Sequence, residues 1–393
     1  MPSTRGLRRW YAVHKWTSLV CTAVLLLLCL TGLPLVFKDE IGRWSGTTID
    51  PPVMPADTPR VSVDRFVADA RARRPDDAVR YVSQSDDAPA WFVSMGKTPD
   101  AAEASAVFKY DARTGAMIHD VPQRRGVIYV IETLHETLFA GLWGTLFLGA
   151  MGLLFMVALA SGLVVYARFM RRLPFGTVRR HRTKRILWAD LHNLLGIGMT
   201  AWMLVVGLTG VVNTLAQPLL LYWRMTELAE MTTPWRGRPP PAELGSLQGA
   251  IDAAREASPG MDVAFVGFPG SRFSTPHHYM VFLRGDTPLT ARLLRPVMID
   301  AETDAVTASR SLPWYLRLLL LSQPLHFGDY GGLPLKVIWA LLDLAAIVIL
   351  VSGLYLWLSR RKSPVEMVIA ELDAAAGGTV AEGGAMASGS AGS

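Results

Sequence analysis

Four of the eight histidines in this 393-residue chain fall into two matched sets. His14 and His192 lie 178 residues apart, and His135 and His326 lie 191 residues apart. Two neutral imidazoles that face one another in an apolar site suit the axial positions of a haem iron, whose potential and reactivity depend on its ligands and on the surrounding polarity. A single histidine beside an apolar run more often caps a helix or bonds a carbonyl. The matching into two sets is therefore what favours ligation.

A zinc site fits the same residues less well, because zinc prefers four donors. No cysteine or carboxylate stands at both copies of the pattern. Glu132 and Glu136 flank His135, whereas Asp329 follows His326, so these carboxylates do not align as ligands.

The histidine spacings belong to a repeat of the whole chain. The first set of matched positions comprises Trp10, His14, Thr31 and Gly32 with Trp188, His192, Thr209 and Gly210, all offset by 178 residues. The second comprises His135, Gly141, Leu142, Ser161, Gly162 and Leu163 with His326, Gly332, Leu333, Ser352, Gly353 and Leu354, all offset by 191 residues. Four of the glycines lie inside apolar runs, where small residues allow close helix approach and leave room for a porphyrin face.

The elements that must position these residues are membrane helices. The chain is 51% hydrophobic, and a membrane span needs about 20 apolar residues. Four runs meet this length: Thr17–Phe37, Ala140–Tyr166, Leu194–Leu215 and Val337–Leu358. The first run is too long for a signal peptide and no small-residue cleavage site follows it. No run shows the mid-membrane break that transport sites use.

Basic residues set the expected orientation, because cytoplasmic loops carry an excess of Lys and Arg. The clusters precede the first span, separate the second from the third, and follow the fourth. Both termini are then cytoplasmic, and the segments 39–126 and 216–325 lie outside. The net charge of +6 is thereby explained without a nucleic-acid partner. The clusters are Arg5, Arg8, Arg9 and Lys15; Arg168, Arg171, Arg172, Arg179, Arg180, Arg182, Lys184 and Arg185; and Arg360, Arg361 and Lys362.

Each outer segment is expected to be a small α+β unit, with one helix packed on a short antiparallel sheet. The first segment has an amphipathic helical pattern at Ser62–Pro75 and the second at Ser246–Pro259. The strand-like runs are Val79–Ser83, Trp91–Met95 and Val107–Tyr110, then Val263–Phe268, Tyr279–Leu283 and Val297–Ile299.

Other reactive residues lie outside the repeat. Cys21 and Cys29 have no zinc or redox spacing and are interpreted as core or lipid-facing. Asp343 is a carboxylate inside an apolar run, which is costly and often functional, but its counterpart is Gly152. A proton relay, a helix-to-helix hydrogen bond and no role at all remain open for it. His277-His278 in the second outer segment could touch a substrate.

The starts of the spans and the Ser-Gly-Leu triplets at 161 and 352 resemble PepSY-associated transmembrane helix proteins, as does Phe37-Lys38-Asp39-Glu40-Ile41. The outer segments resemble PepSY domains, with an Asp-x-x-Thr-Gly turn at Asp111–Gly115; the second copy departs there, with Asp304 in place of Gly115. The resemblance covers about residues 5–362.

The fold expected from the repeat and the resemblance is an α-helical membrane protein with four transmembrane helices in two parallel repeats, each with an extramembrane PepSY-like α+β domain. The expected parts are a cytoplasmic N-terminus and first helix (1–38), a periplasmic PepSY-like domain (39–126), the second helix with its periplasmic approach (127–170), a basic cytoplasmic loop (171–187), the third helix (188–215), a second PepSY-like domain (216–311), the fourth helix with its approach (312–362) and a low-complexity cytoplasmic tail (363–393).

The resemblance implies a bacterial inner-membrane protein of the iron-regulated, ferric-siderophore reductase type. Such a protein would bind haem b, two copies in this chain, through His14, His192, His135 and His326. It would pass electrons outward to a ferric siderophore or other ferric chelate in the periplasm. Because the chain has no flavin or nicotinamide domain, the donor would be a quinol in the membrane or a cytoplasmic reductase.

Two other functions remain open. Isolated PepSY domains are associated with peptidase inhibition and signalling, so the chain could be a membrane-anchored regulator, although that reading leaves the matched histidines unused. The repeat and Asp343 are also compatible with a transporter.

Overall fold

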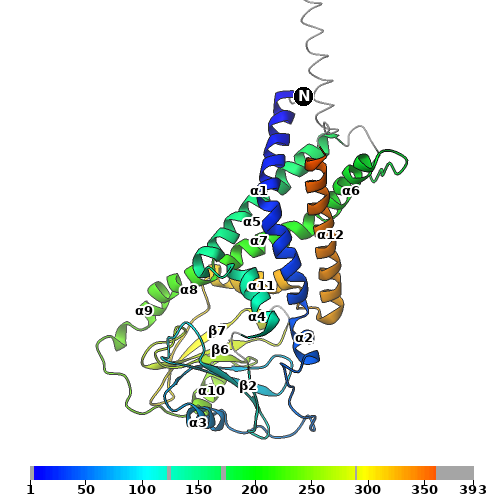
Figure 1. Cartoon of the computed structure of the whole chain (residues 1–393). Helices are drawn as coiled ribbons and strands as arrows, with labels where there is room; N and C mark the ends of the chain where they lie inside the picture. Colours follow the sequence, from blue (N-terminus) through cyan, green and yellow to red (C-terminus); the bar gives the residue numbers. More distant parts are fainter. Residues whose placement is uncertain (1–3, 122–124, 170–173, 288–289, 360–393) are drawn as a thin grey trace, which may run out of the picture. The chain divides into compact units, whose positions relative to one another are not determined.

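The computed structural model describes residues 4–121, 125–169, 174–287 and 290–359, and the chain divides into two compact units (Figure 1). One unit holds the apolar helices and comprises residues 1–36, 133–214 and 325–393; the other comprises residues 37–132 and 215–324. The predicted basic cluster at 360–362 and the tail 363–393 lie outside the described residues, as do Arg171 and Arg172.

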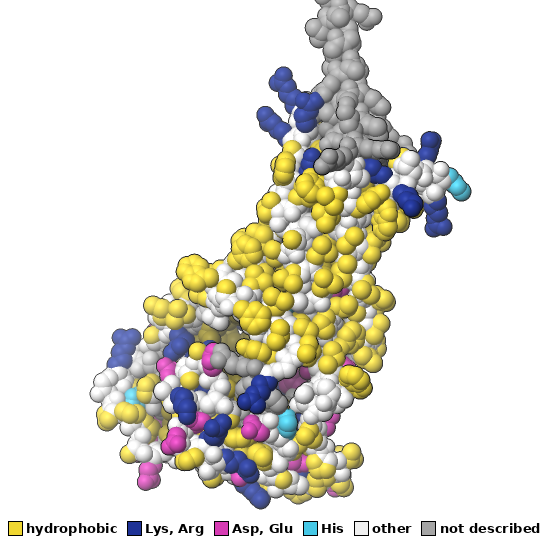
Figure 2. All heavy atoms as spheres, viewed as in Figure 1, with side chains coloured by type: hydrophobic (Ala, Val, Ile, Leu, Met, Phe, Trp, Pro, Cys, Tyr) yellow, Lys and Arg dark blue, Asp and Glu magenta, His cyan; other side chains and the backbone are white. Residues whose placement is uncertain are grey.

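Three helices of the first unit are long and apolar enough to cross a membrane, and a fourth crossing results if a bent pair counts as one span. The three are α1 (Thr4–Val36), α5 (Gly141–Phe169) and α12 (Gly332–Leu358). The bent pair is α6 (Lys184–Gly198) and α7 (Thr200–Thr214). The chain is therefore a membrane protein, and Figure 2 shows apolar side chains covering the visible face of these helices.

The bend between α6 and α7 corrects one expectation from the sequence. The two helices meet at 66° at Met199, so the third apolar run is interrupted after all. Gly196 and Gly198 stand immediately before the bend, and glycine is a weak helix former because it loses the most backbone entropy. This interruption makes the apolar run a broken helix, a feature found at transport sites.

The helices of this unit pack as neighbours around a common interior. α1 contacts α5 and α12, α5 also contacts α7, and α12 also contacts α6. Two short helices lead into the spans: α4 (Gly126–Thr137) precedes α5, and α11 (Trp314–Phe327) precedes α12. The turn after α4 uses positive φ angles at Leu138 and Phe139 (51° and 59°), and the turn after α11 uses one at Gly328 (69°). These tight turns place a histidine at the end of each short helix.

The second unit contains one eight-stranded antiparallel sheet in the order β4-β3-β2-β1-β5-β6-β7-β8. Each outer segment supplies four strands, and β1 pairs with β5 from Tyr81↔Gly267 to Ser83↔Phe265. The two predicted α+β units therefore share a single sheet. The strands are β1 (Ala78–Gln84), β2 (Ala90–Gly96), β3 (Ala106–Asp111), β4 (Met117–Asp120), β5 (Asp262–Gly267), β6 (His278–Arg284), β7 (Arg295–Asp300) and β8 (Val306–Ser309).

Two amphipathic helices cover one face of this sheet, α3 (Val63–Arg73) and α10 (Leu247–Glu256). Ser62 and Ser246 cap their first turns, as serine side chains commonly do. Phe66 and Ile251, one from each helix, are fully buried in a core that continues under both halves of the sheet. The remaining short elements of the chain are α2 (Lys38–Trp44), α8 (Ala216–Trp223), a π-helical turn (Arg224–Leu228), α9 (Ala229–Met231) and 3-10 turns at Thr233–Trp235 and Thr290–Arg292.

The side chain of His278 is fully buried in β6. The Nδ1 atom pairs with the Thr275 hydroxyl at 2.7 Å, and Trp235 packs edge-on with ring centroids 4.5 Å apart. Burial lowers the pKa of His278 to about 4, against a smaller opposing effect of Asp300. The imidazole is therefore neutral at pH 7 and belongs to the core of the sheet unit.

This burial predicts a pH-dependent stability. An unfolded histidine has a pKa of about 6.5, so between that value and about 4 the unfolded state binds a proton that the folded state refuses. Stability should fall as the pH drops through this window, by roughly 3 kcal/mol at most, since one pKa unit corresponds to about 1.4 kcal/mol. Denaturant unfolding of the whole detergent-solubilised protein at several pH values, compared with His278→Asn, measures the effect. Equal pH dependence in the two proteins would contradict it.

Candidate cofactor site

Each of the four matched histidines rests on a hydroxyl–glycine step of another helix, which we call its seat. A Cβ atom added to the glycine would lie within 3.3 Å of the histidine Cε1 atom in every case. His14 sits on Ser161-Gly162 of α5, His192 on Ser352-Gly353 of α12, His135 on Thr31-Gly32 of α1, and His326 on Thr209-Gly210 of α7. The repeated glycines therefore make room for the imidazole rings themselves.

Three of the imidazoles donate a hydrogen bond from Nδ1 to a helix carbonyl. The acceptors are the carbonyl oxygens of Ala158 for His14 (2.9 Å), Ile349 for His192 (3.0 Å) and Val206 for His326 (2.9 Å). The Nδ1 atom of His135 pairs with the Thr31 hydroxyl at 2.9 Å. The hydroxyls of Ser352 and Thr209 lie 3.1 and 3.4 Å from Nδ1 of His192 and His326.

The seat follows from helix geometry. In an α-helix the carbonyl of residue i is covered by the side chains of residues i+3 and i+4. In each seat the hydroxyl residue stands at i+3 and the glycine at i+4, so an outside donor can reach the carbonyl across the glycine. The hydroxyl bonds the same carbonyl, at 3.0 Å from Ser161 to Ala158 and 2.8 Å from Ser352 to Ile349. The Ser-Gly and Thr-Gly steps thereby create an accessible acceptor inside an apolar helix.

This arrangement fixes the imidazole tautomer. A carbonyl only accepts hydrogen bonds, so the proton of the neutral ring resides on Nδ1 and the lone pair on Nε2. At His135 the Thr31 hydroxyl donates to Leu27 O at 2.7 Å and therefore accepts from the ring. Within the described part of the chain, no hydrogen bond reaches Nε2 of any of these four rings. Metal-ligating histidines commonly bond a carbonyl through the other ring nitrogen in this way.

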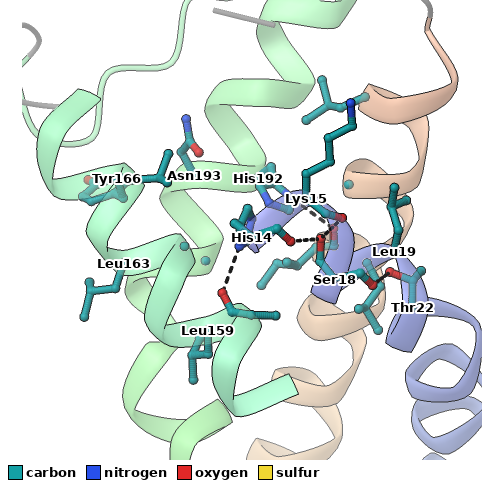
Figure 3. A pocket seen from close by; sticks show the side chains of 18 of the residues that line it. His14, Lys15, Ser18, Leu19, Thr22, Leu159, Leu163, Tyr166, His192 and Asn193 are labelled. Carbon is teal, nitrogen blue, oxygen red and sulfur yellow. Dashed lines mark hydrogen bonds between the residues drawn. The ribbon is translucent and has the colours of Figure 1, made fainter. Parts of the chain in front are cut away.

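The structure brings His14 and His192 to one cavity of about 530 Å³ (Figure 3). Its volume lies in the range of sites for small molecules and cofactors. Gly162 and Gly353 lie on its wall beside the two rings, and most other wall residues are apolar. The polar groups on the wall include Tyr11, Lys15, Tyr166, Arg185 and Asn193.

His135 and His326 form the other pair, and His326 acts electrostatically on the His135 ring, as His14 does on the His192 ring. The expected ligand role of the four histidines stays a prediction. Among the described residues, no three His, Cys, Asp or Glu side chains converge as a metal-binding group. The donor set at each pair is therefore two neutral imidazoles, which suits a haem iron better than zinc.

The sequence matches the family described as PepSY-associated TM region over residues 11–360. The chain belongs to this PepSY-associated family. Among curated relatives, it is 31% identical over 252 residues to the uncharacterized protein PA4219 of Pseudomonas aeruginosa, a match that covers 58% of this chain and 63% of that relative. The match therefore spans less than two thirds of the relative's length.

Proposed function

We propose that this PepSY-associated protein is a di-haem reductase of the bacterial inner membrane, which passes electrons outward to a ferric siderophore or other ferric chelate. In this proposal the bent α6–α7 pair is one span, so four spans form two parallel repeats. Both termini are cytoplasmic and the sheet unit is periplasmic. His14 and His192 hold the inner haem b, and His135 and His326 hold the outer one. A quinol or a cytoplasmic reductase is the electron donor.

The single observation that carries this proposal is the fourfold seat. Four imidazoles in two pairs have Nδ1 bonded to a helix and Nε2 left with its lone pair. The same arrangement recurs at all four positions. A haem held between two such rings supplies a one-electron carrier inside a medium that otherwise blocks charge.

The chain's own groups perform the remaining tasks. The seats orient the four rings before any cofactor binds, which reduces the entropy that ligation must overcome. The apolar wall of the inner cavity limits the access of water, while Lys15 and Arg185 bring positive charge to it, which complements haem carboxylates. His14 and Gly32 stand 18 residues apart in the continuous helix α1, which corresponds to about 27 Å, so the two pairs lie at different depths.

The purified protein tests the proposal directly. We expect a reducible haem absorption spectrum, with two haems per chain by quantitation, from cells that make haem in excess. A colourless preparation from such cells would contradict the reductase and would favour the membrane-anchored PepSY regulator.

Transport is a second candidate, favoured by the bend at Met199. Substrate sites of many transporters are formed where a membrane helix is interrupted. Unlike the reductase, a transporter would move a labelled solute across a liposome membrane without any change in haem absorption.

The seats also predict a graded series of variants. A Cβ would approach Cε1 of the histidine to 2.8 Å at Gly162, 3.0 Å at Gly210, 3.2 Å at Gly32 and 3.3 Å at Gly353. Overpacking costs about 1–3 kcal/mol, so Gly162→Ala should weaken haem retention by roughly tenfold or more, and Gly353→Ala least. The haem that each variant retains after competition with apomyoglobin measures the order of these losses. Gly149→Ala is the matched control, since its Cβ would press on the Thr214 side chain of α7 and not on a histidine ring. Equal losses at all four seats would contradict the ring-contact explanation.

A further inference from the structure

A carboxylic acid stands inside the apolar helix α12 without a basic partner in contact. Asp343 lies in the interior of this 27-residue helix, and its Oδ2 atom is buried and has no hydrogen-bond partner among the described residues. A carboxyl group inside a membrane is expensive and usually functional. The proposed function assigns it no role.

The described neighbourhood of Asp343 includes a thiol and a cluster of apolar side chains. The thiol of Cys29, on α1, is its hydrogen-bonding neighbour. Cys29, Leu342 and Ala345 pack against a buried cluster formed by Met199, Met203, Ala346 and Ile349. Trp202 packs against the same cluster, and its indole Nε1 is a buried donor that also lacks a partner within the described residues. One buried acceptor and one buried donor, each without a partner among the described residues, thus lie in one apolar layer.

This layer adjoins the outer histidine pair. Cys29 stands two residues before Thr31, whose hydroxyl pairs with Nδ1 of His135. On α12, Trp339 stands one helical turn before Asp343 and donates from Nε1 to the backbone carbonyl of His326 at 3.2 Å. Trp339 also packs edge-on against Trp202, with ring centroids 6.3 Å apart. Asp343 therefore lies about one turn inward from the outer seats, a rise of about 6 Å.

Asp343 and Cys29 have no acid or thiol at the matched positions of the other half of the chain. The position matched to Asp343 is Gly152 on α5, and the position matched to Cys29 is Gly207 on α7. A Cβ at Gly152 would fall 2.7 Å from Val211, and one at Gly207 would clash with the side chain of Met156. The α5–α7 interface is therefore closed by aliphatic contacts where the α1–α12 interface holds an acid and a thiol.

We infer that Asp343 is the proton-uptake site of the outer histidine pair, an inference that rests on the proposed function. When one electron from the donor reaches the cofactor at His135 and His326, one proton from water adds to Asp343 Oδ2 and converts the carboxylate to the acid. When that electron leaves for the ferric chelate, the proton returns to water. The net charge of the layer stays constant through the cycle.

The physical reason is the low dielectric of the layer. A ferric porphyrin core with two neutral imidazoles carries one net positive charge, and a carboxylate one turn away balances it. Adding an electron removes that positive charge and would leave the carboxylate alone in an apolar medium, which is costly. Protonation of the carboxylate removes this cost.

The carboxylates nearest to the outer histidines in the sequence are Glu132, Glu136 and Asp329. Cys29 is the titratable group of α1 that contacts Asp343. Lys15, on the same helix, stands 14 residues before Cys29, about 21 Å away along the axis. On α12 itself, Lys336 stands seven residues earlier. The titratable side chains of α6, the other helix packed on α12, are Lys184, Arg185, Asp190 and His192.

Spectroelectrochemical titration of the full-length, haem-loaded protein between pH 6 and 8 tests the inference. The midpoint potential of the outer haem should fall with rising pH, by up to about 59 mV per unit, which corresponds to one proton per electron. Asp343→Asn should abolish this slope and leave the inner haem unchanged, whereas Asp343→Glu should retain it. In reduced-minus-oxidised infrared spectra, a protonated carboxyl band should appear in the wild type and be lost in Asp343→Asn.

The outcomes separate the two proposals. A protein that binds no haem would refute the reductase and this inference together. A di-haem protein whose outer potential does not vary with pH, or varies equally in Asp343→Asn, would refute the inference and leave the reductase standing.

Discussion

Replacement of His14 or His192 by alanine should remove the same haem, and replacement of His135 or His326 should remove the other. In the proposed arrangement the two histidines of each pair ligate one iron, and within each pair one ring acts electrostatically on the other. Loss of either ligand leaves an iron with one axial imidazole in a site whose geometry was set for two. We expect each variant to retain one haem of two. Haem quantitation measures this, as does the loss of one of the two haem contributions from the reduced absorption spectrum.

The control for this series is His181→Ala, since His181 is exposed and lies outside both pairs. That variant should keep both haems. If His14→Ala and His135→Ala removed one common haem, the proposed pairing would be wrong. The additional double variant His14→Ala/His192→Ala should lose no more haem than either single variant, because both act on one site.

The second large effect concerns the direction of electron flow. In liposomes, the reduced wild type should reoxidise when a ferric chelate is added on the side of the sheet unit. Release would follow because Fe(II) binds hard oxygen donors more weakly than Fe(III). His135→Ala should block this reoxidation and leave the inner haem reducible, whereas His14→Ala should prevent reduction from the cytoplasmic side. Stopped-flow absorption in the haem bands measures both steps.

The observation that would contradict an outward-directed reductase is fast reoxidation of His135→Ala by an external chelate. Absence of reoxidation in the wild type with every ferric chelate tried would do the same. A redox-inactive gallium chelate provides the matched control, because it should occupy the same surface without oxidising the protein.

The matched positions could be found in the sequence because they recur at constant offsets of 178 and 191 residues. His14 and His192 were identified in this way, together with Gly162 and Gly353. The role of the glycines was only half right: they lie against imidazole rings, which the sequence could not show because the contact joins different helices. The signal for the seat hydroxyls in the sequence is the recurring Ser-Gly and Thr-Gly step, whose bond to a histidine of another helix appears only in the fold.

The sheet unit shows why other features were missed. The strands β4 and β8 have four residues each and lie at the two edges of the sheet, so their burial patterns are too short to detect. The pairing of β1 with β5 joins residues far apart in the chain, which no local pattern encodes. Asp304 occupies the position in the second turn that Gly115 occupies in the first. It adopts the same left-handed conformation, with a φ of 58° compared with 74° at Gly115. Aspartate tolerates that region better than most residues.

The β1–β5 ladder has a mechanical consequence for the protein. It ties the outer segment of one half to that of the other through paired backbone groups, and Phe66 and Ile251 from opposite halves share the core beneath it. Two halves that rocked against each other to open alternately on either side would have to shear this ladder on every cycle. A carrier of electrons needs no such movement, because charge can cross a framework whose atoms stay in place. A single sheet shared by the two halves therefore suits electron transfer through a fixed framework better than transport by movement of one half against the other.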